Sequence, residues 1–356
     1  MMSVEIKPYT SRKDKSDPRI LIIRLSALGD LIECTRYIHG FRRYWPQGRF
    51  ELLTSRLGHK LYAESPLFEA IHIWPRKESL RRRLKAIRAV REHEFDYIFD
   101  LHGNKSSGWL TTMMHTHNVG RIGAGPLHKT FIGRYRKNPR TVTQMLKQVG
   151  IRIPEARVAE LDACRPELLV SEEAQEAVRA RLSTGGLALD RPMILLAPGS
   201  SEKWPSKRWS ADRFRQLAKG LIEQGYSVVL VGTEEEMALG EIISQGCDKL
   251  LDWIGMTELS ELVALASLAQ GCVANDSGPM HVAAAVGTPT LGLFGPTMAE
   301  RHGPEEIHGP SHRSLSFKVA CSPCYEGRCP KPSLFCLEGI EVAEVLRAIV
   351  EMVVRR

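Results

Sequence analysis

The segment 275–281 (NDSGPMH) places a carboxylate, a hydroxyl, a glycine and a histidine directly after an apolar run. Pro279 suits the first position of a helix, because the N–H that it lacks would have no partner there. Ser277 and Gly278 would then leave backbone N–H groups at the mouth of a helix, and such a mouth binds phosphate. The alternative is structural: Asp276 and Ser277 cap the helix, and His281 packs inside it.

Phosphate also needs positive charge, and the segment 198–205 (PGSSEKWP) provides it. Two small hydroxyl residues, Ser200 and Ser201, and then Lys203 follow the end of another apolar run. Ligands of doubly wound sheets bind at the carboxyl ends of the strands, where the strand order reverses. We therefore predict that Lys203 contacts a diphosphate as a point charge. The alternative is a surface lysine in a proline-bounded turn.

Two loops in the first half of the chain are further candidates. Asp30 follows Gly29 and would lie in the first turn of a helix, a position that the helix dipole favours even without a function. The segment 100–104 (DLHGN) ends another apolar run. His102 is predicted either to line the same ligand site or to make a structural hydrogen bond.

Four of the eight cysteines lie within one short segment: Cys321, Cys324, Cys329 and Cys336. Their spacing only loosely matches common zinc sites. Prolines interrupt the segment, so without a cross-link it would be an unusually loose loop. Three alternatives follow: a structural zinc or iron ion, unligated thiols, or disulfides. None of them would take part in catalysis.

Charge is distributed unequally along the chain. Residues 1–160 contain 30 Lys and Arg against 15 Asp and Glu, whereas residues 161–356 contain 19 against 26. The densest basic run extends from Arg76 to Arg91 and includes Lys77, Arg81, Arg82, Arg83, Lys85 and Arg88. Helical spacing would put four apolar residues on one face: Leu80, Leu84, Ile87 and Val90. Such a basic half attracts polyanions, and the alternative is a solvated helix face.

The elements that must position these residues alternate between strands and helices. Apolar runs predict strands at 19–25, 50–53, 71–74, 97–101, 193–197, 227–231, 249–253, 272–275 and 290–294. Helical periodicity predicts helices at 31–41, 211–223, 235–244, 258–269, 279–286 and 341–354, and one that begins at Ser171. This alternation predicts α/β domains with parallel sheets and right-handed crossovers.

The length of 356 residues, with 43% hydrophobic and 25% charged residues, fits a globular protein of two domains. We predict a flexible tail at 1–18, an N-terminal domain at 19–165, a connector at 166–190, a C-terminal domain at 191–338 and a last helix at 339–356. No run has the pattern of a signal peptide or a membrane span, which predicts a cytosolic protein. The common P-loop and dinucleotide fingerprints are missing.

Five motifs together resemble the bacterial heptosyltransferases, which form glycosyltransferase family nine. They are 25–30 (LSALGD), 99–103 (FDLHG), 203–205 (KWP), 275–281 (NDSGPMH) and 294–297 (FGPT), in the family's order. The resemblance runs from about residue 19 to the C-terminus. It implies two Rossmann-like domains facing a cleft, the GT-B architecture, with the acceptor bound mainly by the first domain and the donor by the second. It also implies an inverting, ADP-heptose:lipopolysaccharide heptosyltransferase activity.

The resemblance further implies roles for individual residues. Asp30 matches the proposed general base, and Ser200, Ser201 and Lys203 match the diphosphate loop. Asp276, Ser277, Gly278 and His281 match the donor motif. Glu234 resembles the acid that holds the ribose hydroxyls, and Met256 resembles the residue beside adenine. The spacing from Ser200 to Lys203 is shorter than in some members of the family.

The expected partners are an ADP-sugar donor and an anionic, Kdo-bearing lipid A acceptor, which Arg81, Arg82, Arg83 and His102 would bind. The expected location is cytoplasmic, peripheral at the inner face of the inner membrane. Lys203 and the helix mouth would stabilise the departing diphosphate, so no catalytic cofactor is required. Alternatives are another sugar or acceptor, including autotransporter proteins, or a nucleotide-sugar epimerase. A nucleic-acid-binding protein is disfavoured, because few aromatic residues accompany the basic run.

Overall fold

The computed structural model describes residues 15–76, 78–114, 118–122, 141–185, 191–247 and 249–354. The chain divides into two compact units: unit 1 joins residues 1–25 to 37–164, and unit 2 joins residues 26–36 to 165–356. Parts of three predicted features lie outside the described residues: 1–14 of the tail, Lys77 of the basic run and 186–190 of the connector.

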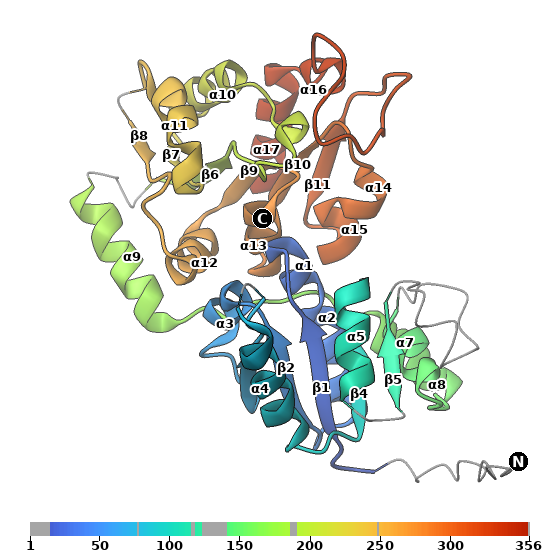
Figure 1. The fold of residues 1–356 in the computed structure, drawn as a ribbon. Coiled ribbons are helices and arrows are strands. Elements are labelled where there is room, and N and C mark those ends of the chain that lie inside the picture. Colours follow the sequence, from blue (N-terminus) through green and yellow to red (C-terminus); the bar gives the residue numbers. More distant parts are fainter. Residues whose placement is uncertain are drawn as a thin grey trace, which may run out of the picture. The chain divides into compact units, whose positions relative to one another are not determined.

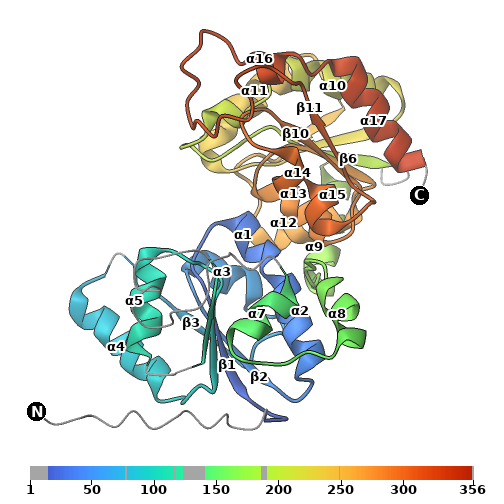
Figure 2. The same cartoon turned by 90° about the vertical axis from the view of Figure 1, so that its right-hand side faces the viewer.

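Unit 1 is built on a parallel sheet. Its described strands lie in the order β3 (Ala70–Ile73), β2 (Arg49–Thr54), β1 (Arg19–Arg24), β4 (Tyr97–Asp100) and β5 (Val119–Arg121). Helices α4 (Leu80–Arg91) and α5 (Lys105–Met113) lie on one face of the sheet, and α2 (Thr35–Tyr44) and α7 (Val142–Gln148) lie on the other (Figure 2). Among the described residues, this unit also contains the helices α3 (Arg56–Tyr62) and α8 (Glu155–Asp162).

Unit 2 contains a second parallel sheet. Its described strands lie in the order β11 (Arg313–Ser316), β10 (Thr290–Phe294), β9 (Gly271–Asn275), β6 (Met193–Ala197), β7 (Ser227–Leu230) and β8 (Leu250–Asp252). One face carries α10 (Ala211–Glu223), α11 (Met237–Ser244) and α17 (Val342–Val354), and the other carries α12 (Leu259–Leu268), α13 (Gly278–Ala285) and α15 (Pro304–His308) (Figure 1). Unit 2 also contains the short helices η1 (Pro205–Lys207), η2 (Glu234–Glu236), α14 (Ala299–His302) and α16 (Phe335–Glu338).

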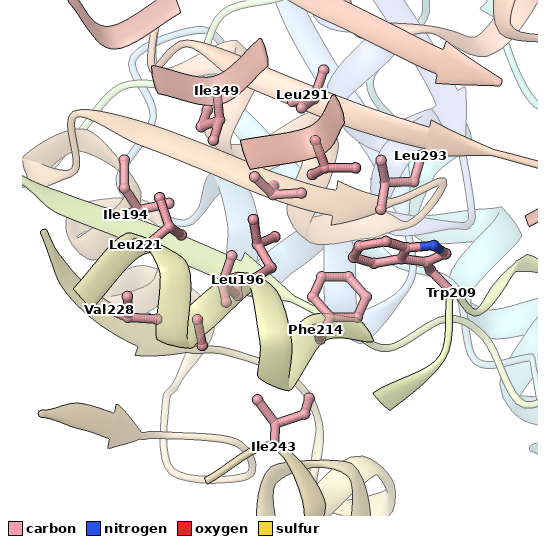
Figure 3. Packing of buried hydrophobic residues seen from close by; sticks show 14 of the residues in the cluster. Ile194, Leu196, Trp209, Phe214, Leu221, Val228, Ile243, Leu291, Leu293 and Ile349 are labelled. Carbon is pink, nitrogen blue, oxygen red and sulfur yellow. The ribbon is translucent and has the colours of Figure 1, made fainter. Parts of the chain in front are cut away.

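The core of unit 2 lies between the sheet and its α10 and α17 face. Ile194 and Leu196 of β6 pack with Phe214 of α10 and Ile349 of α17, and all four side chains are buried (Figure 3). Strand residues of this kind are apolar on both faces of the sheet, as expected when helices cover both. The predicted α/β class with two parallel sheets is therefore confirmed. Strands β5 and β11 were not predicted, since VGR and RSLS are not apolar runs.

Two segments at the unit boundaries belong to unit 2. Helix α1 (Leu28–Glu33), which the sequence analysis included in the N-terminal domain, packs against α13. Helix α9 (Glu172–Thr184), in the predicted connector, packs against α12. Its start is the predicted one, since the Ser171 side chain accepts a hydrogen bond from the Ala174 N–H. Among the described residues, no helix is both long enough and apolar enough to span a membrane.

Candidate functional site

The strand order of unit 2 reverses between β6 and β9. β6 pairs with β7 on one side and with β9 on the other, and Ala197 lies beside Ala274. The loops that leave these two strands therefore begin side by side. Asn275 joins them, because its side-chain amide donates to the Pro198 carbonyl at 2.7 Å. This is the position at which open α/β sheets bind their ligands.

The mouth of α13 opens at this reversal point. Its N-cap residue, Ser277, is extended, and its side chain makes no capping hydrogen bond. The Ser277 hydroxyl oxygen is buried and has no hydrogen-bond partner among the described residues. The helix begins at Gly278, so Pro279 is its second residue and not its first. The N–H groups of the first turn have no hydrogen-bond partner within the helix, so they can donate hydrogen bonds to an anion there.

Lys207 supplies a positive charge beside this mouth. Its Nζ lies 2.7 Å from Oδ2 of Asp276 and 4.8 Å from the centre of the Trp204 ring. Thr297 donates to the same carboxylate oxygen at 2.6 Å. Burial raises the pKa of Asp276, but the charge of Lys207 and the hydrogen bonds outweigh it and hold that pKa below its ordinary value. Asp276 is thus an ionised anchor for Lys207.

The loop after β6 is folded by internal contacts. The Ser200 hydroxyl donates to the Trp204 carbonyl at 2.8 Å and accepts from Arg208 Nε at 3.2 Å. Ser200 is therefore buried and occupied, whereas Ser201 and Lys203 are exposed. Of the residues predicted in this loop, Ser201 and Lys203 are the ones whose side chains are accessible to a ligand.

Glu236 joins the loops after β6 and β7. Its carboxylate accepts from the Thr233 N–H at 2.9 Å, and the Ser200 backbone N–H also donates to it. Burial raises the pKa of Glu236 above its ordinary value, against the hydrogen bonds and the charge of Arg208. A Cβ at Gly199 would lie 1.9 Å from the Glu236 carboxylate, so any larger residue there would displace that carboxylate.

Glu234 and Met256 lie at the carboxyl ends of the neighbouring strands β7 and β8. Both side chains are exposed. The turn before Met256 contains Gly255 at φ +74°, and a Cβ there would lie 3.1 Å from the Cα of Glu234. The structure therefore brings these two predicted donor residues close together on the side of the reversal point that carries β7 and β8.

Asp30 reaches the same region because α1 packs closely on α13. A Cβ at Gly29 would lie 2.5 Å from Cδ2 of His281, and one at Gly278 would lie 2.9 Å from Cδ2 of Leu28. The two glycines thus permit the approach of the two helices (Figure 1). Asp30 is exposed, and one of its carboxylate oxygens accepts the Ala27 N–H at 3.0 Å. This bond fixes the carboxylate at the start of α1.

His281 begins a row of three buried histidines. Its Nδ1 lies 3.2 Å from Nε2 of His308, and the His308 ring is 6.0 Å from the His312 ring. Burial lowers the pKa of all three, to about 2 for His308 and to about 4 for His312. Asp276, Glu33 and Asp30 oppose the shift at His281 but do not reverse it. His281 is therefore neutral and packs against α1. This matches the structural alternative, in which His281 is a packing residue.

The cysteine segment packs against the donor loops. Cys321, Cys324, Cys329 and Cys336 line one small pocket together with Ser206 and Pro296. Burial raises the pKa of the Cys336 thiol, and the other three thiols raise it further. The Ser206 hydroxyl donates to the Glu326 carbonyl at 2.6 Å, and the Tyr325 N–H donates to the Pro296 carbonyl at 2.9 Å. All four thiols are free, so the structure has no disulfide there.

In unit 1, Asp100 organises the loop after β4. Its buried carboxylate accepts from the backbone N–H groups of His102 and Gly103, each at 3.0 Å, and from Arg121 Nε at 2.8 Å. His102 itself is half-buried, and its Nε2 lies 2.7 Å from Nδ2 of Asn104. His102 thus makes the structural hydrogen bond that the sequence analysis offered as one alternative.

The basic helix α4 is only partly amphipathic. Ile87 and Val90 are buried as predicted, but Leu80 is 70% exposed and Leu84 41% exposed. Leu80 and Leu84 therefore leave the first half of the predicted apolar face exposed, whereas Ile87 and Val90 pack in the core of unit 1. Arg81 and Arg82 are exposed and Arg83 is half-buried. Arg82 pairs with Glu78 at 2.7 Å.

The sequence favoured Lys203 for the diphosphate, with Lys207 or Arg208 as the alternative, and it predicted no donor role for Glu236 and Thr297. The contacts of Lys207 and Thr297 with Asp276, and of Glu236 with Ser200, join loops that are distant in the chain. The one local signal was weak: Lys207 and Arg208 continue the basic character of the loop beyond Pro205. Nothing in the sequence distinguishes buried Glu236 from exposed Glu234 and Glu235, since three glutamates stand in a row.

Three known proteins illustrate what this chain is similar to. Lipooligosaccharide heptosyltransferase 2 of Haemophilus influenzae is 39% identical over 152 residues, which are 41% of this chain and 43% of that protein. The structure of the ADP-heptose LPS heptosyltransferase II of Escherichia coli matches with a TM-score of 0.75 and 23% identity, over 95% of this chain and 99% of that one. The iron-containing dodecameric glycosyltransferase TibC of enterotoxigenic E. coli matches with a TM-score of 0.54 and 16% identity, over 95% and 76%.

The family comparison covers most of the chain. The model of glycosyltransferase family 9 (heptosyltransferase) matches residues 83–334. This range contains every described strand of unit 2 and the mouth of α13. The chain therefore belongs to glycosyltransferase family 9, the heptosyltransferases.

Proposed function

We propose that this protein transfers a heptosyl group from ADP-heptose to the inner core of lipopolysaccharide, with inversion at the anomeric carbon. Membership of the heptosyltransferase family supports the class of reaction. The observation that carries the proposal is the pairing of the α13 mouth with Lys207, which Asp276 holds at 2.7 Å. A cation and free helix N–H groups at one strand-order reversal suit a diphosphate.

The donor lies across the carboxyl ends of the unit 2 strands. Lys207 and the N–H groups at Ser277 and Gly278 hold the diphosphate, and Ser201 and Lys203 contact it from the exposed part of the neighbouring loop. Glu234 accepts hydrogen bonds from the ribose hydroxyls, and Met256 packs on the adenine ring. Support for the nucleoside end comes from the proximity of Glu234 to the Met256 turn and from the exposure of both side chains.

Asp30 acts as the general base. Its carboxylate takes the proton of the acceptor hydroxyl while that oxygen attacks the anomeric carbon, and the bond from the anomeric carbon to the diphosphate breaks. ADP leaves with the bonding electron pair, and Lys207 and the α13 mouth stabilise its charge. The close packing of α1 on α13 supports this role, because it holds Asp30 in the unit that holds the donor.

The acceptor is an anionic lipid-linked sugar that unit 1 binds at the cytoplasmic face of the inner membrane. The charge imbalance of residues 1–160 supports this part of the proposal. The first turn of α4 adds a second observation, because exposed Leu80 stands beside exposed Arg81 and Arg82. A basic helix with exposed apolar residues is suited to an anionic membrane surface. His102 and Arg83 would contact the acceptor headgroup.

The four cysteines hold a structural zinc or iron ion. Their gathering around one pocket supports the proposal, and thiolates are preferred ligands of both metals. No three of these sulfur atoms lie within 4.8 Å of one another in the described chain, so binding would draw the exposed Cys321 and Cys324 inward. The segment supports the loop before Lys207 through Ser206, which gives the metal a structural effect on donor binding.

A donor screen tests the function. Thermal unfolding is measured with ADP-heptose, ADP, a UDP-hexose and a GDP-hexose, all at one concentration that is about a hundredfold above the dissociation constant of the adenine compounds. The adenine compounds should raise the unfolding free energy by about 2.7 kcal/mol. Transfer of heptose to heptose-free lipopolysaccharide, followed by mass spectrometry, then tests the acceptor. Stabilisation by a UDP-sugar alone, or transfer to protein only, would favour the epimerase or the protein-modifying alternative instead.

A further inference from the structure

Unit 1 contains a second cluster of metal-ligating side chains, far from the cysteines in the sequence. Glu51 of β2, which is 2% exposed, lies between His72 of β3 and His93, which follows α4. Its Oε2 is 2.7 Å from Nε2 of His72 and 2.8 Å from Nδ1 of His93. Among the described residues, this is the one group of three or more histidine, cysteine or acidic side chains whose ligand atoms all lie within 4.8 Å of one another.

The position of Glu51 is unusual for a carboxylate. Successive strand residues alternate between faces, so Glu51 shares a face with Leu53, which packs with Ile87 and Val90 of α4. A charged group in this layer is costly unless it is paired or coordinates a metal. The two imidazoles approach it from an edge strand and from the connection between α4 and β4.

Arg19 also approaches Glu51, but on its other oxygen. Its Nε lies 3.5 Å from Oε1, and its Nη1 is engaged with the His93 carbonyl at 2.8 Å. His72 Nε2 faces Oε2, whereas His93 Nδ1 lies 2.8 Å from Oε2 and 2.9 Å from Oε1. Both imidazoles therefore turn a ring nitrogen toward the carboxylate, at shorter range than the guanidinium.

We propose that Glu51, His72 and His93 bind one divalent transition-metal ion, with Zn²⁺ as the expected ion. Two imidazoles and a carboxylate are a zinc ligand set, with Zn–N and Zn–O distances of about 2.0–2.2 Å, and ligand atoms this close can share one ion. Hard ions such as Mg²⁺ prefer oxygen ligands and would bind worse. A water completes the coordination.

The role of this ion is structural. β3 is the edge strand of its sheet, and its four residues are at most half-buried. The ion would join β3 to β2 and to the end of α4. It would stabilise the edge of the sheet at β3, where few apolar contacts do so. Glu51 and Arg19 lie toward the amino-terminal ends of β2 and β1, the edge opposite to the loops that bind ligands in α/β sheets. The proposal does not depend on the heptosyltransferase activity.

The test uses the full-length chain with Cys321→Ser and Cys324→Ser, so that the cysteine segment does not compete for metal. Zn²⁺ is titrated calorimetrically into the metal-free protein, and Co²⁺ binding is followed by absorbance. We expect one equivalent of each ion to bind. The Co²⁺ spectrum should show visible d–d bands of nitrogen and oxygen ligands without thiolate charge transfer. Zn²⁺ should also raise the melting temperature, whereas Mg²⁺ should not.

Variants then assign the ligands. His72→Gln and His93→Gln should each weaken Zn²⁺ binding by about tenfold or more, while His59→Gln, in α3 of the same unit, should leave it unchanged. Circular dichroism establishes that each variant is folded. The zinc-induced rise in the melting temperature of the parent protein is an independent measurement that requires neither ligand variant. Absence of Zn²⁺ binding to the parent protein, or equal binding by parent and His72→Gln, would show that the cluster is only a hydrogen-bonded carboxylate.

Discussion

Lys207 and Asp276 form an ion pair of 2.7 Å that joins the end of β9 to the turn after Pro205. Asp276 is 9% exposed and Lys207 18% exposed, so the pair is largely shielded from solvent. The acid of the 275–281 motif is therefore engaged by a lysine beside the first turn of α13. In the proposed donor complex, that lysine and not the acid faces the diphosphate. Lys207 is therefore expected to contribute more than Lys203 to the affinity for the donor.

Replacing Lys207 should weaken ADP binding more than replacing Lys203. Lys207→Met removes a fixed charge beside the helix mouth, and the expected loss is about 1.5–3 kcal/mol, or roughly ten- to hundredfold in affinity. Lys203 is exposed, so Lys203→Met should have the smaller effect. Calorimetry with ADP measures both. Equal affinity of Lys207→Met and the parent would remove Lys207 from the diphosphate site.

Asp30→Asn should slow turnover by about 10²–10⁴-fold and leave ADP affinity nearly unchanged. The amide oxygen of asparagine can still accept the Ala27 N–H, so the start of α1 is preserved. Glu33→Gln, in the same helix, is the matched control and should retain turnover within a fewfold. The comparison requires kcat and KM for both substrates. A normal kcat for Asp30→Asn would mean that another group is the base.

Unit 2 should lose stability as the pH falls from about 6.5 to 4.5. In the folded chain burial holds the pKa of His308 at about 2 and that of His312 at about 4, whereas in the unfolded chain both return to about 6.5. The unfolded state therefore binds more protons in this window, and each histidine costs roughly 2 kcal/mol across it. Below the folded pKa values no further loss arises from these groups.

Urea unfolding at several pH values measures this loss. His312→Gln, which cannot titrate, should flatten the pH dependence, and His59→Gln should not change it. The loss of stability that arises from Asp276 occurs at lower pH, because the pKa of this carboxylate in the folded chain lies below its ordinary value of 3.8. An unfolding free energy that is constant between pH 6.5 and 4.5 would contradict the picture of neutral, buried histidines.

Reversing the charge of Arg81, Arg82 and Arg83 to Glu should raise the acceptor KM severalfold and reduce binding to anionic liposomes. Attraction between exposed charges falls off within a Debye length, roughly 8 Å at physiological salt, so high salt should weaken the parent in the same way. A matched control reverses Arg179, Lys219 and Arg347, which are exposed in unit 2. Identical behaviour of the two triple variants, or no salt dependence, would leave α4 as a solvated helix.

Removing the metal of the cysteine segment should lower thermal stability and weaken ADP binding together. Ser206 is bonded to the Glu326 carbonyl, and a Cβ at Gly327 would lie 2.4 Å from the Lys203 carbonyl, so disorder in the segment would reach the donor loop. The measurements are elemental analysis, melting temperature and ADP calorimetry on parent and Cys321→Ser. Cys247→Ser, a buried cysteine outside the segment, is the control. Metal-free parent protein with four titrating thiols and full stability would contradict the proposal.

The fold class and most of the element order follow from local sequence pattern. Apolar runs such as 19–25 and 193–197 form strands that are covered on both faces. Such strands are apolar along their whole length, so the sequence pattern reveals them directly. The 275–281 motif predicted its own strand, loop and helix, because proline and glycine constrain the backbone locally. Ser171 marked the start of α9 for the same kind of local reason.

Which side chains meet depends on how the elements pack in three dimensions. The pairs of Lys207 with Asp276 and of Glu236 with Ser200 join segments that are adjacent in the sheet and distant in the chain. The packing of Gly29 on His281, and the meeting of Glu51 with two histidines, likewise depend on strand order and helix docking. Local sequence pattern encodes backbone preference, whereas these contacts arise from long-range packing, which no single window of sequence specifies.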